Sequence, residues 1–598
     1  MGKLIQDSTS RPQSAQPILL HPAFIFAVTF VVIFLLHAPL LSLPYFWDEA
    51  GYYVPAARDL LLTGSLIPHT TVSNAHPPLV MVWLAIWWKL VGFAPLVTRT
   101  AMLVVSAFSL LGIFRLAQRA ANTPVAIAST LCTALYPVFF AQSSLAQIDL
   151  AAAGFTFWGL LAYLDDRPGW QALWFSLALL AKETAIVAPA ALAAWEFGKY
   201  LLRNKFWQVD LKQDCANGDG VEISSRTKLV RALALIAPVL PLTLWYAYHY
   251  ARTGYVFGNP EFFRYNVAAT LNLTRFFLAL VLRLWQVFGY LHLWLLTLAM
   301  LLAMLLPPVS DRGVPSAIRP RIALSVQMVF YVVIAAYIVA MSAIGGAVLA
   351  RYMLPVVPLL IIIAISTLRR RLRHWTPAVA FIALAFVAGW FWNPPYGFSP
   401  EDNLAYRDYI LLHENAERFL EARYPNARVL TAWPASDELT RPWLGYTTRP
   451  MQVVRIDDFS ATEVLSAAEF RANFNLALVF STKYEPAHPL FGHWKTWERL
   501  KTRFFNFHRD LPPALIAHLL GAHLVYSDVR RGQWVAVLEV ERNEPQEAEY
   551  PSETPHKHPQ ELQVSARYRL PVPDLVAHSE FRGIPLRPSN DIVFSTTY

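Results

Sequence analysis

The chain has 598 residues, of which 55% are hydrophobic and only 15% are charged. Soluble globular proteins carry about 25% charged residues, so this composition excludes an ordinary soluble domain. The formal net charge is +9, but the basic residues stand between apolar blocks, as in Arg369–Arg373. That placement is typical of the positive-inside rule and not of a nucleic-acid-binding surface. We therefore expect a polytopic membrane protein surrounded by lipid, with no nucleic-acid partner.

The apolar blocks predict a mainly α chain, a transmembrane helical bundle of about eleven spans. Blocks near 20 residues match the thickness of the hydrocarbon core. The spans are expected at residues 18–43, 97–117, 124–141, 150–164, 170–181, 185–202, 229–250, 288–306, 322–344, 352–368 and 375–392. Residues 1–17 would form a cytoplasmic tail, and 18–392 the membrane domain.

A further apolar stretch at residues 76–93 is not counted as a span. If it crossed the bilayer, the basic loops would fall on opposite sides, whereas Lys and Arg concentrate on the cytoplasmic side. Its tryptophans and Lys89 suit an interfacial or re-entrant helix. The segment 44–97 and the C-terminal part would then lie outside, in a multi-pass protein of the plasma (inner) membrane.

After Trp392 the composition becomes polar and mixed. A helical pattern at 404–423 alternates with apolar runs typical of buried strands at 428–432, 476–481 and 534–540. We expect a small extramembrane α/β domain over residues 393–540, on the external or periplasmic side. Residues 541–598 begin with a Pro- and Glu-rich stretch and are interpreted as a linker and tail.

Two adjacent acids, Asp48 and Glu49, directly follow the first predicted span and are surrounded by aromatic residues. Carboxylates at such a place are usually paired or functional. The alternative is that one of them caps the helix that starts near Ala50. Arg99, at the start of the next span, is interpreted as a charge that sets topology.

Five short motifs along residues 18–392 resemble GT-C glycosyltransferases, in particular the protein O-mannosyltransferase and aminoarabinose transferase branch (glycosyltransferase family 39-like). In chain order they are Phe46-Trp47-Asp48-Glu49 with Tyr52-Tyr53, His76-Pro77-Pro78-Leu79, Gln147-Ile148-Asp149, Ala181-Lys182-Glu183-Thr184 and Arg351-Tyr352-Met353-Leu354-Pro355-Val356-Val357-Pro358. The chain departs from that branch at His76, where many bacterial members carry Lys. The C-terminal domain resembles no family.

The resemblance implies a membrane glycosyltransferase that moves a sugar from a polyprenyl-phosphate donor, with inversion, to a lipid, glycan or protein acceptor on the outer face. A hydroxyl acceptor needs a general base, which a carboxylate can supply. The leaving phosphate ester departs as a stable anion and needs cations, not a general acid. A glycoside hydrolase would instead need two carboxyl groups flanking the bond.

The resemblance also implies the site. Asp48 is the expected base, and the further catalytic acids are Asp149 and Glu49. The residues expected to bind the donor phosphate are Lys182, Arg351 and His76. The residues expected to bind substrate are Tyr52, Tyr53 and Tyr352.

Each of these residues has an alternative interpretation. Asp149 could cap the helix that begins at Leu150. Lys182 could extend to the membrane surface, and Arg351 could be an interface anchor. The histidines near Asp48 are spaced too irregularly to predict a metal site. No cofactor is required; the sequence is compatible with a divalent cation but does not indicate one.

Two other function classes compete with the transferase. A transporter or lipid flippase without transferase activity would place ionisable residues in the middle of its spans and show two repeated halves. Here the acids stand at the ends of spans, and no repeat is evident. A receptor or assembly protein gives no reason for two acids among aromatic residues.

Overall fold

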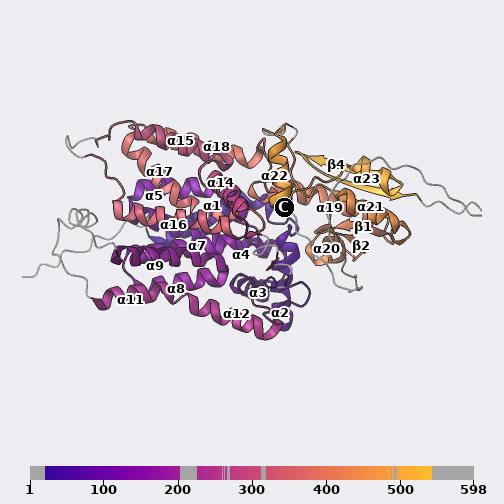
Figure 1. Ribbon diagram of the computed structural model, residues 1–598, viewed down its shortest axis with the longest axis horizontal. Helices are drawn as coiled ribbons and strands as arrows, with labels where there is room; N and C mark the ends of the chain where they lie inside the picture. The colour runs from indigo at the N-terminus through magenta and orange to yellow at the C-terminus, as the bar shows by residue number, and fades with distance from the viewer. Residues whose placement is uncertain are drawn as a thin grey trace, which may run out of the picture.

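A computed structural model describes residues 21–201, 225–258, 260, 263–264, 270–310, 318–486, 488–490 and 494–541. The tail predicted at 1–17 and, apart from Glu541, the linker and tail at 541–598 lie outside the described residues. The chain forms a long helical bundle with an α/β domain at one end (Figure 1).

The bundle contains most of the described helices. They are α1 (Pro22–His37), α4 (Pro95–Ala120), α5 (Thr123–Leu135), α6 (Pro137–Gln142), α7 (Asp149–Leu164), α8 (Pro168–Ala181), α9 (Val187–Leu201), α11 (Ser225–Ile236), α12 (Val239–Thr253), α14 (Leu273–Phe288), α15 (Leu293–Met304), α16 (Leu324–Ala343), α17 (Val357–Arg371) and α18 (Trp375–Phe391). Within the described ranges, 5 helical segments are long and apolar enough to cross a membrane. The polytopic helical fold is confirmed, and the count of about eleven spans stays a prediction.

Local sequence explains where several of these helices begin. Proline occupies the first turn of α1, α4, α5 and α8, where its missing N–H costs no hydrogen bond. At α5 the side chain of Asn122 also accepts a hydrogen bond from the backbone N–H of Val125, which caps the helix. The breaks between spans are therefore encoded locally.

The segment from α14 to α15 differs from the sequence prediction. The sequence predicts a span only at 288–306, but Leu273–Met304 is one long apolar segment that bends where Leu291 and His292 have positive φ. Two arginines of α14 are buried. Arg275 and Arg283 donate to backbone carbonyl groups of Gly345 and Leu349, each at 2.7 Å, which explains how an apolar helix accommodates them.

Two short helices, α2 (Val54–Thr63) and α3 (Leu79–Val91), lie at the end of the bundle nearer the α/β domain (Figure 1). The 13 residues of α3 rise about 20 Å. That is less than the thickness of a hydrocarbon core of about 30 Å. This length suits the interfacial or re-entrant placement, which stays a prediction.

The C-terminal domain is built on a 5-stranded sheet in the order β2-β1-β3-β5-β4. The strands are β1 (Arg428–Ala432), β2 (Gln452–Ile456), β3 (Leu476–Phe480), β4 (Ala522–Arg530) and β5 (Gln533–Val540). β1 pairs in parallel with β2 and β3, whereas β5 runs antiparallel to β3 and β4. The helices are α19 (Ala405–Arg423), α20 (Ala435–Thr440), α21 (Ala461–Glu469), α22 (Lys495–Phe505) and α23 (Pro513–Leu520).

The sequence predicted the three inner strands and the long helix α19 but missed both edge strands. β3 is buried along its whole length, whereas β2 and β4 contain no fully buried residue. A half-exposed edge strand lacks the continuous apolar run that predicts a buried strand, so the sequence contains no such signal for β2 and β4.

The core of the α/β domain continues into the segment that follows α1. Phe46 packs edge to face on Tyr409 of α19, with ring centroids 5.3 Å apart. A Cβ atom at Gly51 would lie 2.6 Å from the ring of Trp433, so only glycine allows this close approach. The α/β domain therefore packs directly against the segment that carries Asp48 and Glu49.

Candidate active site

Asp48 directly precedes the short π-helix η3 (Glu49–Tyr53) and follows a strained residue. Trp47 has φ +45°, in a region that non-glycine residues rarely adopt and that often occurs at functional sites. Its buried ring packs edge to face on Tyr409 and Trp433, with centroids 5.5 and 5.1 Å away. The side chain of Asp48 makes no capping hydrogen bond, so helix capping does not explain this acid.

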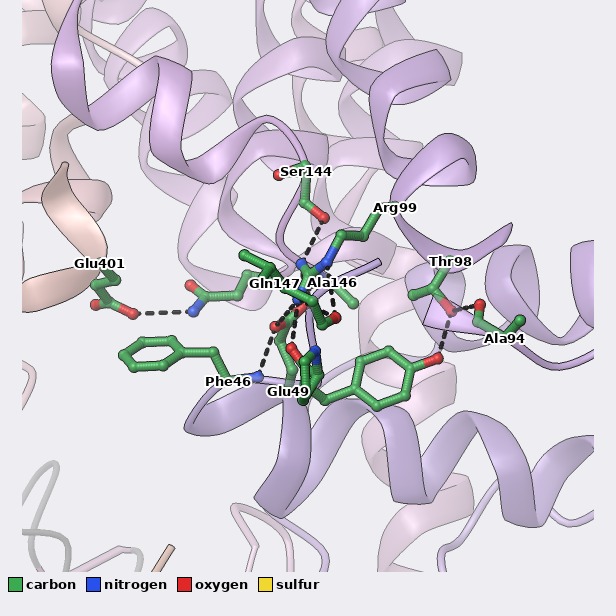
Figure 2. Close-up of polar contacts among 12 residues, drawn as sticks. Phe46, Glu49, Ala94, Thr98, Arg99, Ser144, Ala146, Gln147 and Glu401 are labelled. Carbon is green, nitrogen blue, oxygen red and sulfur yellow. Dashed lines mark hydrogen bonds and ion pairs between the residues drawn. The ribbon is translucent and has the colours of Figure 1, made fainter. Parts of the chain in front are cut away.

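Glu49 lies in a separate and fully buried network (Figure 2). Its carboxylate accepts hydrogen bonds from the backbone N–H groups of Phe46, at 2.8 Å, and Ala146. It also forms an ion pair with Arg99, whose Nη1 lies 3.3 Å from Oε1. The interpretation of Arg99 as a topological charge is wrong, because such a charge would lie in water or among headgroups and this one is buried.

Arg351, in the short helix η7 (Ala350–Met353), connects carboxylates from distant parts of the chain. Its Nη2 donates to Asp48, and its Nη1 donates to Glu401 and to the side-chain oxygen of Gln147. The amide of Gln147 in turn donates to Glu401 at 2.9 Å, a contact visible in Figure 2. Arg351 is 3% exposed, so it is not an anchor at the membrane interface.

Asp149 and Lys182 form a second ion pair that adjoins Arg351. Asp149 is the first residue of α7, and its carboxylate accepts from Lys182 Nζ at 2.6 Å. The other carboxylate oxygen lies 3.3 Å from Arg351 Nε. Lys182, at the end of α8, is buried. Neither capping alone nor extension to the membrane surface describes this pair.

The ring of Tyr352 lies among three cations. Lys182 Nζ is 4.0 Å from the ring centroid, and the guanidinium carbons of Arg283 and Arg351 are 5.4 and 5.8 Å from it. Arg283 is fully buried, and its Nη2 has no hydrogen-bond partner among the residues that the structure describes. The face of an aromatic ring attracts cations, so Tyr352 can hold positive charge together at the end of the bundle.

The remaining predicted residues lie beside this cluster and not within it. His76 Nδ1 contacts the carboxylate of Glu183, the neighbour of Lys182, at 2.8 Å. The Tyr53 ring lies 6.1 Å from the His76 ring, whereas the Tyr52 ring lies 6.0 Å from Trp433 of the α/β domain. His76 therefore pairs with an acid, while Lys182 and Arg351 pair with Asp149 and Asp48.

Sequence reasoning missed Arg283 and two adjacent acids, Glu401 and Asp402. Burial raises the pKa of Glu401 despite the nearby Arg351 guanidinium. Burial and the Glu401 charge raise the pKa of Asp402 to about 8. The sequence contains a pattern that could have predicted Glu401 and Asp402, because this pair of adjacent acids follows the last predicted span just as Asp48 and Glu49 follow the first.

Comparison with known proteins shows which family and which fold the chain resembles. Residues 75–241 match the family described as dolichyl-phosphate-mannose-protein mannosyltransferase. The crystal structure of ArnT from Cupriavidus metallidurans bound to undecaprenyl phosphate is 15% identical, with a TM-score of 0.50, and the match covers 86% of this chain and 97% of that one. The chain therefore has the fold of the GT-C glycosyltransferases. The predicted GT-C fold with a C-terminal α/β domain is confirmed.

A weaker structural similarity is to an archaeal oligosaccharyltransferase. The oligosaccharyltransferase of Archaeoglobus fulgidus, in its complex with Zn and sulfate, is 11% identical with a TM-score of 0.42, over 76% of this chain and 67% of that one. No curated protein sequence matches the chain.

Proposed function

We propose that the protein transfers a sugar from a polyprenyl-phosphate donor to an acceptor hydroxyl group at the outer face of the membrane, with inversion at the anomeric carbon. The observation that carries this proposal is the cluster of cations around Tyr352, with the Asp48 carboxylate at its edge. A chain of the same fold is bound to undecaprenyl phosphate, which is the leaving group that such a reaction would release.

Asp48 is the general base in this proposal. Its side chain is 17% exposed, whereas those of Arg351 and Asp149 are each 4% exposed, so of these three groups it is the one an acceptor reaches most easily. The contact with Arg351 uses Oδ2 and leaves Oδ1 for the acceptor. As the acceptor oxygen bonds to the anomeric carbon, its proton passes to Asp48 and the bond from that carbon to the phosphate oxygen breaks.

Lys182, Arg283 and Arg351 stabilise the departing phosphate. Lys182 and Arg351 already pair with Asp149 and Asp48, so the phosphate would share them, while the Nη2 group of Arg283 donates to no described group. Fixed donors aimed at developing charge are among the largest contributions to catalysis. Glu401 and Gln147 position Arg351 through its other nitrogen.

The same geometry disfavours a transporter. The charged groups of the site stand at helix ends or in short connecting helices; they are Asp48, Asp149, Lys182 and Arg351. Glu401 comes from the segment that leads into the α/β domain. A transporter would place its ionisable groups on interrupted helices near the bilayer midplane.

The proposed topology places these helix ends and the α/β domain outside the plasma membrane, in a periplasm where one exists. A reporter-fusion scan tests the topology directly. A reporter near residue 450 should be accessible from outside, and a cytoplasmic signal there would overturn the outer-face site.

Sugar transfer is tested on purified protein in detergent. Wild type is mixed with a panel of polyprenyl-phosphate sugars and a membrane extract that supplies acceptors, and released polyprenyl phosphate and new glycoconjugates are measured by mass spectrometry. Wild type and Glu469→Gln, a change at an exposed helix position, should both turn over, whereas Asp48→Asn should not. Equal turnover by Asp48→Asn would contradict the proposal.

A further inference from the structure

A second cluster of titratable groups lies inside the α/β domain, away from Arg351. His413 and Glu417 stand one turn apart on α19, and Glu438 comes from α20. All three are at most 1% exposed. His413 Nδ1 lies 2.6 Å from a Glu438 oxygen and 3.8 Å from Glu417 Oε1. One ligand atom from each side chain lies within 4.8 Å of the others.

The only basic group in this cluster is the His413 imidazole, and no Lys or Arg joins it among the described residues. Neither Glu417 nor Glu438 forms an ion pair with a Lys or Arg there, and the nearby Arg441 and Arg455 both pair with Asp437. Two buried carboxylates are costly when one imidazole is their only basic partner, because burial removes their hydration and one imidazole can balance at most one negative charge.

The polar atoms of the cluster are also left without partners. Both oxygens of Glu417, Oε1 of Glu438 and Nε2 of His413 are buried with no hydrogen-bond partner in the described part of the chain. Native proteins leave few buried polar atoms unpaired, and each unpaired atom requires an explanation such as a bound ion. Glu417 is the most pronounced case, since its whole carboxylate is unpaired and lies beside the other two ligands.

We propose that His413, Glu417 and Glu438 bind a divalent first-row transition-metal ion such as Zn²⁺ or Mn²⁺. One imidazole and two carboxylates form a mixed N and O ligand set that suits such ions, whereas Mg²⁺ and Ca²⁺ prefer oxygen alone. Ligand atoms bound at about 2.0 to 2.2 Å from one ion are at most about 4.4 Å apart, close to the separations here. The complete burial indicates a structural site.

The proposed metal would tie α19 to α20 directly behind the segment that carries Asp48. The Tyr409 ring stacks on His413 at 4.0 Å and contacts the rings of Phe46 and Trp47 at 5.3 and 5.5 Å. A single ring therefore separates the cluster from the strained residue before Asp48. The α/β domain would then help to hold that segment in place.

The competing state has protons in place of the ion. Burial and the adjacent Glu438 carboxylate raise the pKa of Glu417 well above its ordinary value, so the two acids could share protons. The two states differ in how they respond to Glu417→Gln. In the proton-sharing state the amide introduced by this change would replace a protonated carboxyl group at little cost in stability. In the metal-bound state the same change would remove a charged metal ligand.

The test is the metal content of the full-length protein, purified in detergent through a tag without histidine and analysed by inductively coupled plasma mass spectrometry. We expect about one transition-metal ion per chain in wild type. Glu417→Gln and His413→Gln should lose it, while Glu469→Gln and His523→Gln, at exposed positions, should retain it. Wild type without metal, or equal content in all variants, would overturn the site.

Thermal unfolding provides a second readout. A strong chelator should lower the unfolding temperature of wild type, and added Zn²⁺ should restore it. Co²⁺ added to the chelated protein should give visible absorption bands, and Zn²⁺ should abolish these bands by displacing Co²⁺. The metal would be refuted, and the proton-sharing state established, by two results together. The chelator would leave the unfolding temperature of wild type unchanged, and Glu417→Gln would unfold at the same temperature as wild type or at a higher one.

Discussion

Asp48 and Glu49 are neighbours in the chain but belong to two different ionic networks. Glu49 is fully buried against Arg99, and both of its oxygens are hydrogen-bonded. Asp48 is partly exposed and contacts Arg351 through a single oxygen, in a cluster where oxygens of Asp149 and Glu401 still lack hydrogen bonds.

This difference separates an acid that stabilises the fold from one that, in the proposed reaction, is available for chemistry. A closed network of paired charges has no capacity left for a ligand. An open one retains donors and acceptors that a substrate can use, and functional sites often show such unsatisfied groups. Adjacent residues on a turn point in different directions, so one element serves both purposes.

The largest expected effect is at Asp48. Asp48→Asn keeps the size of the side chain but cannot take a proton, and general-base contributions are typically about 100- to 10,000-fold. Asp48→Glu keeps the charge but displaces it, and a misplacement of about 1 Å can cost on the order of 100-fold. Transfer rates of purified variants decide. Full activity in Asp48→Asn would place the base elsewhere.

Loss of the cations around Tyr352 should come next. Removal of one fixed donor to developing charge typically costs about 100- to 1000-fold in kcat. We therefore expect Lys182→Met and Arg283→Met each to slow transfer by that order, with a smaller loss for Lys182→Arg, which keeps the charge. Arg119→Met, at a half-exposed ion pair, is the matched control. Normal rates in both Met variants would remove phosphate binding from this cluster.

At Glu49 the expected effect is on stability. Glu49→Gln leaves the buried Arg99 guanidinium with backbone carbonyl acceptors but no counter-charge, and breaking a buried ion pair in this way typically costs about 3 to 5 kcal/mol. The double variant Glu49→Gln with Arg99→Met should recover part of that loss, since replacing a whole buried pair is often neutral. Thermal unfolding measures this. The pH profile of transfer per folded molecule should stay unchanged in Glu49→Gln, and a shifted profile would make Glu49 the base.

The smallest effect is a pH dependence at Asp402. Its pKa is about 8 in the folded chain against an ordinary value of 3.8, so the folded state binds a proton that the unfolded state has released between these values. Stability from this group is thus lost as pH rises from about 4 to 8. The unfolding temperature of Asp402→Asn minus that of wild type should therefore increase as pH rises through that window. A difference that stays constant with pH would contradict the raised pKa of Asp402.

The sequence alone determined the architecture of this protein. Apolar blocks predicted the helical bundle, proline and asparagine marked helix starts, and motif order indicated the GT-C fold that structural comparison confirms. The strand prediction succeeded for β3 and β5, whose apolar runs are visible locally. It failed for β2 and β4, where exposure on one side removes that run.

Only the tertiary structure decided which charges meet. Glu401 reaches Arg351 across 50 residues, Asp48 reaches it across 303, and Glu49 selects Arg99 instead. Local pattern reports burial and backbone propensity, which are properties of neighbouring residues. An ion pair between distant segments depends on how helices pack. For that reason Asp48, Lys182 and Arg351 could be named from the sequence, whereas Arg283, Glu401 and the pairing of these charges could not.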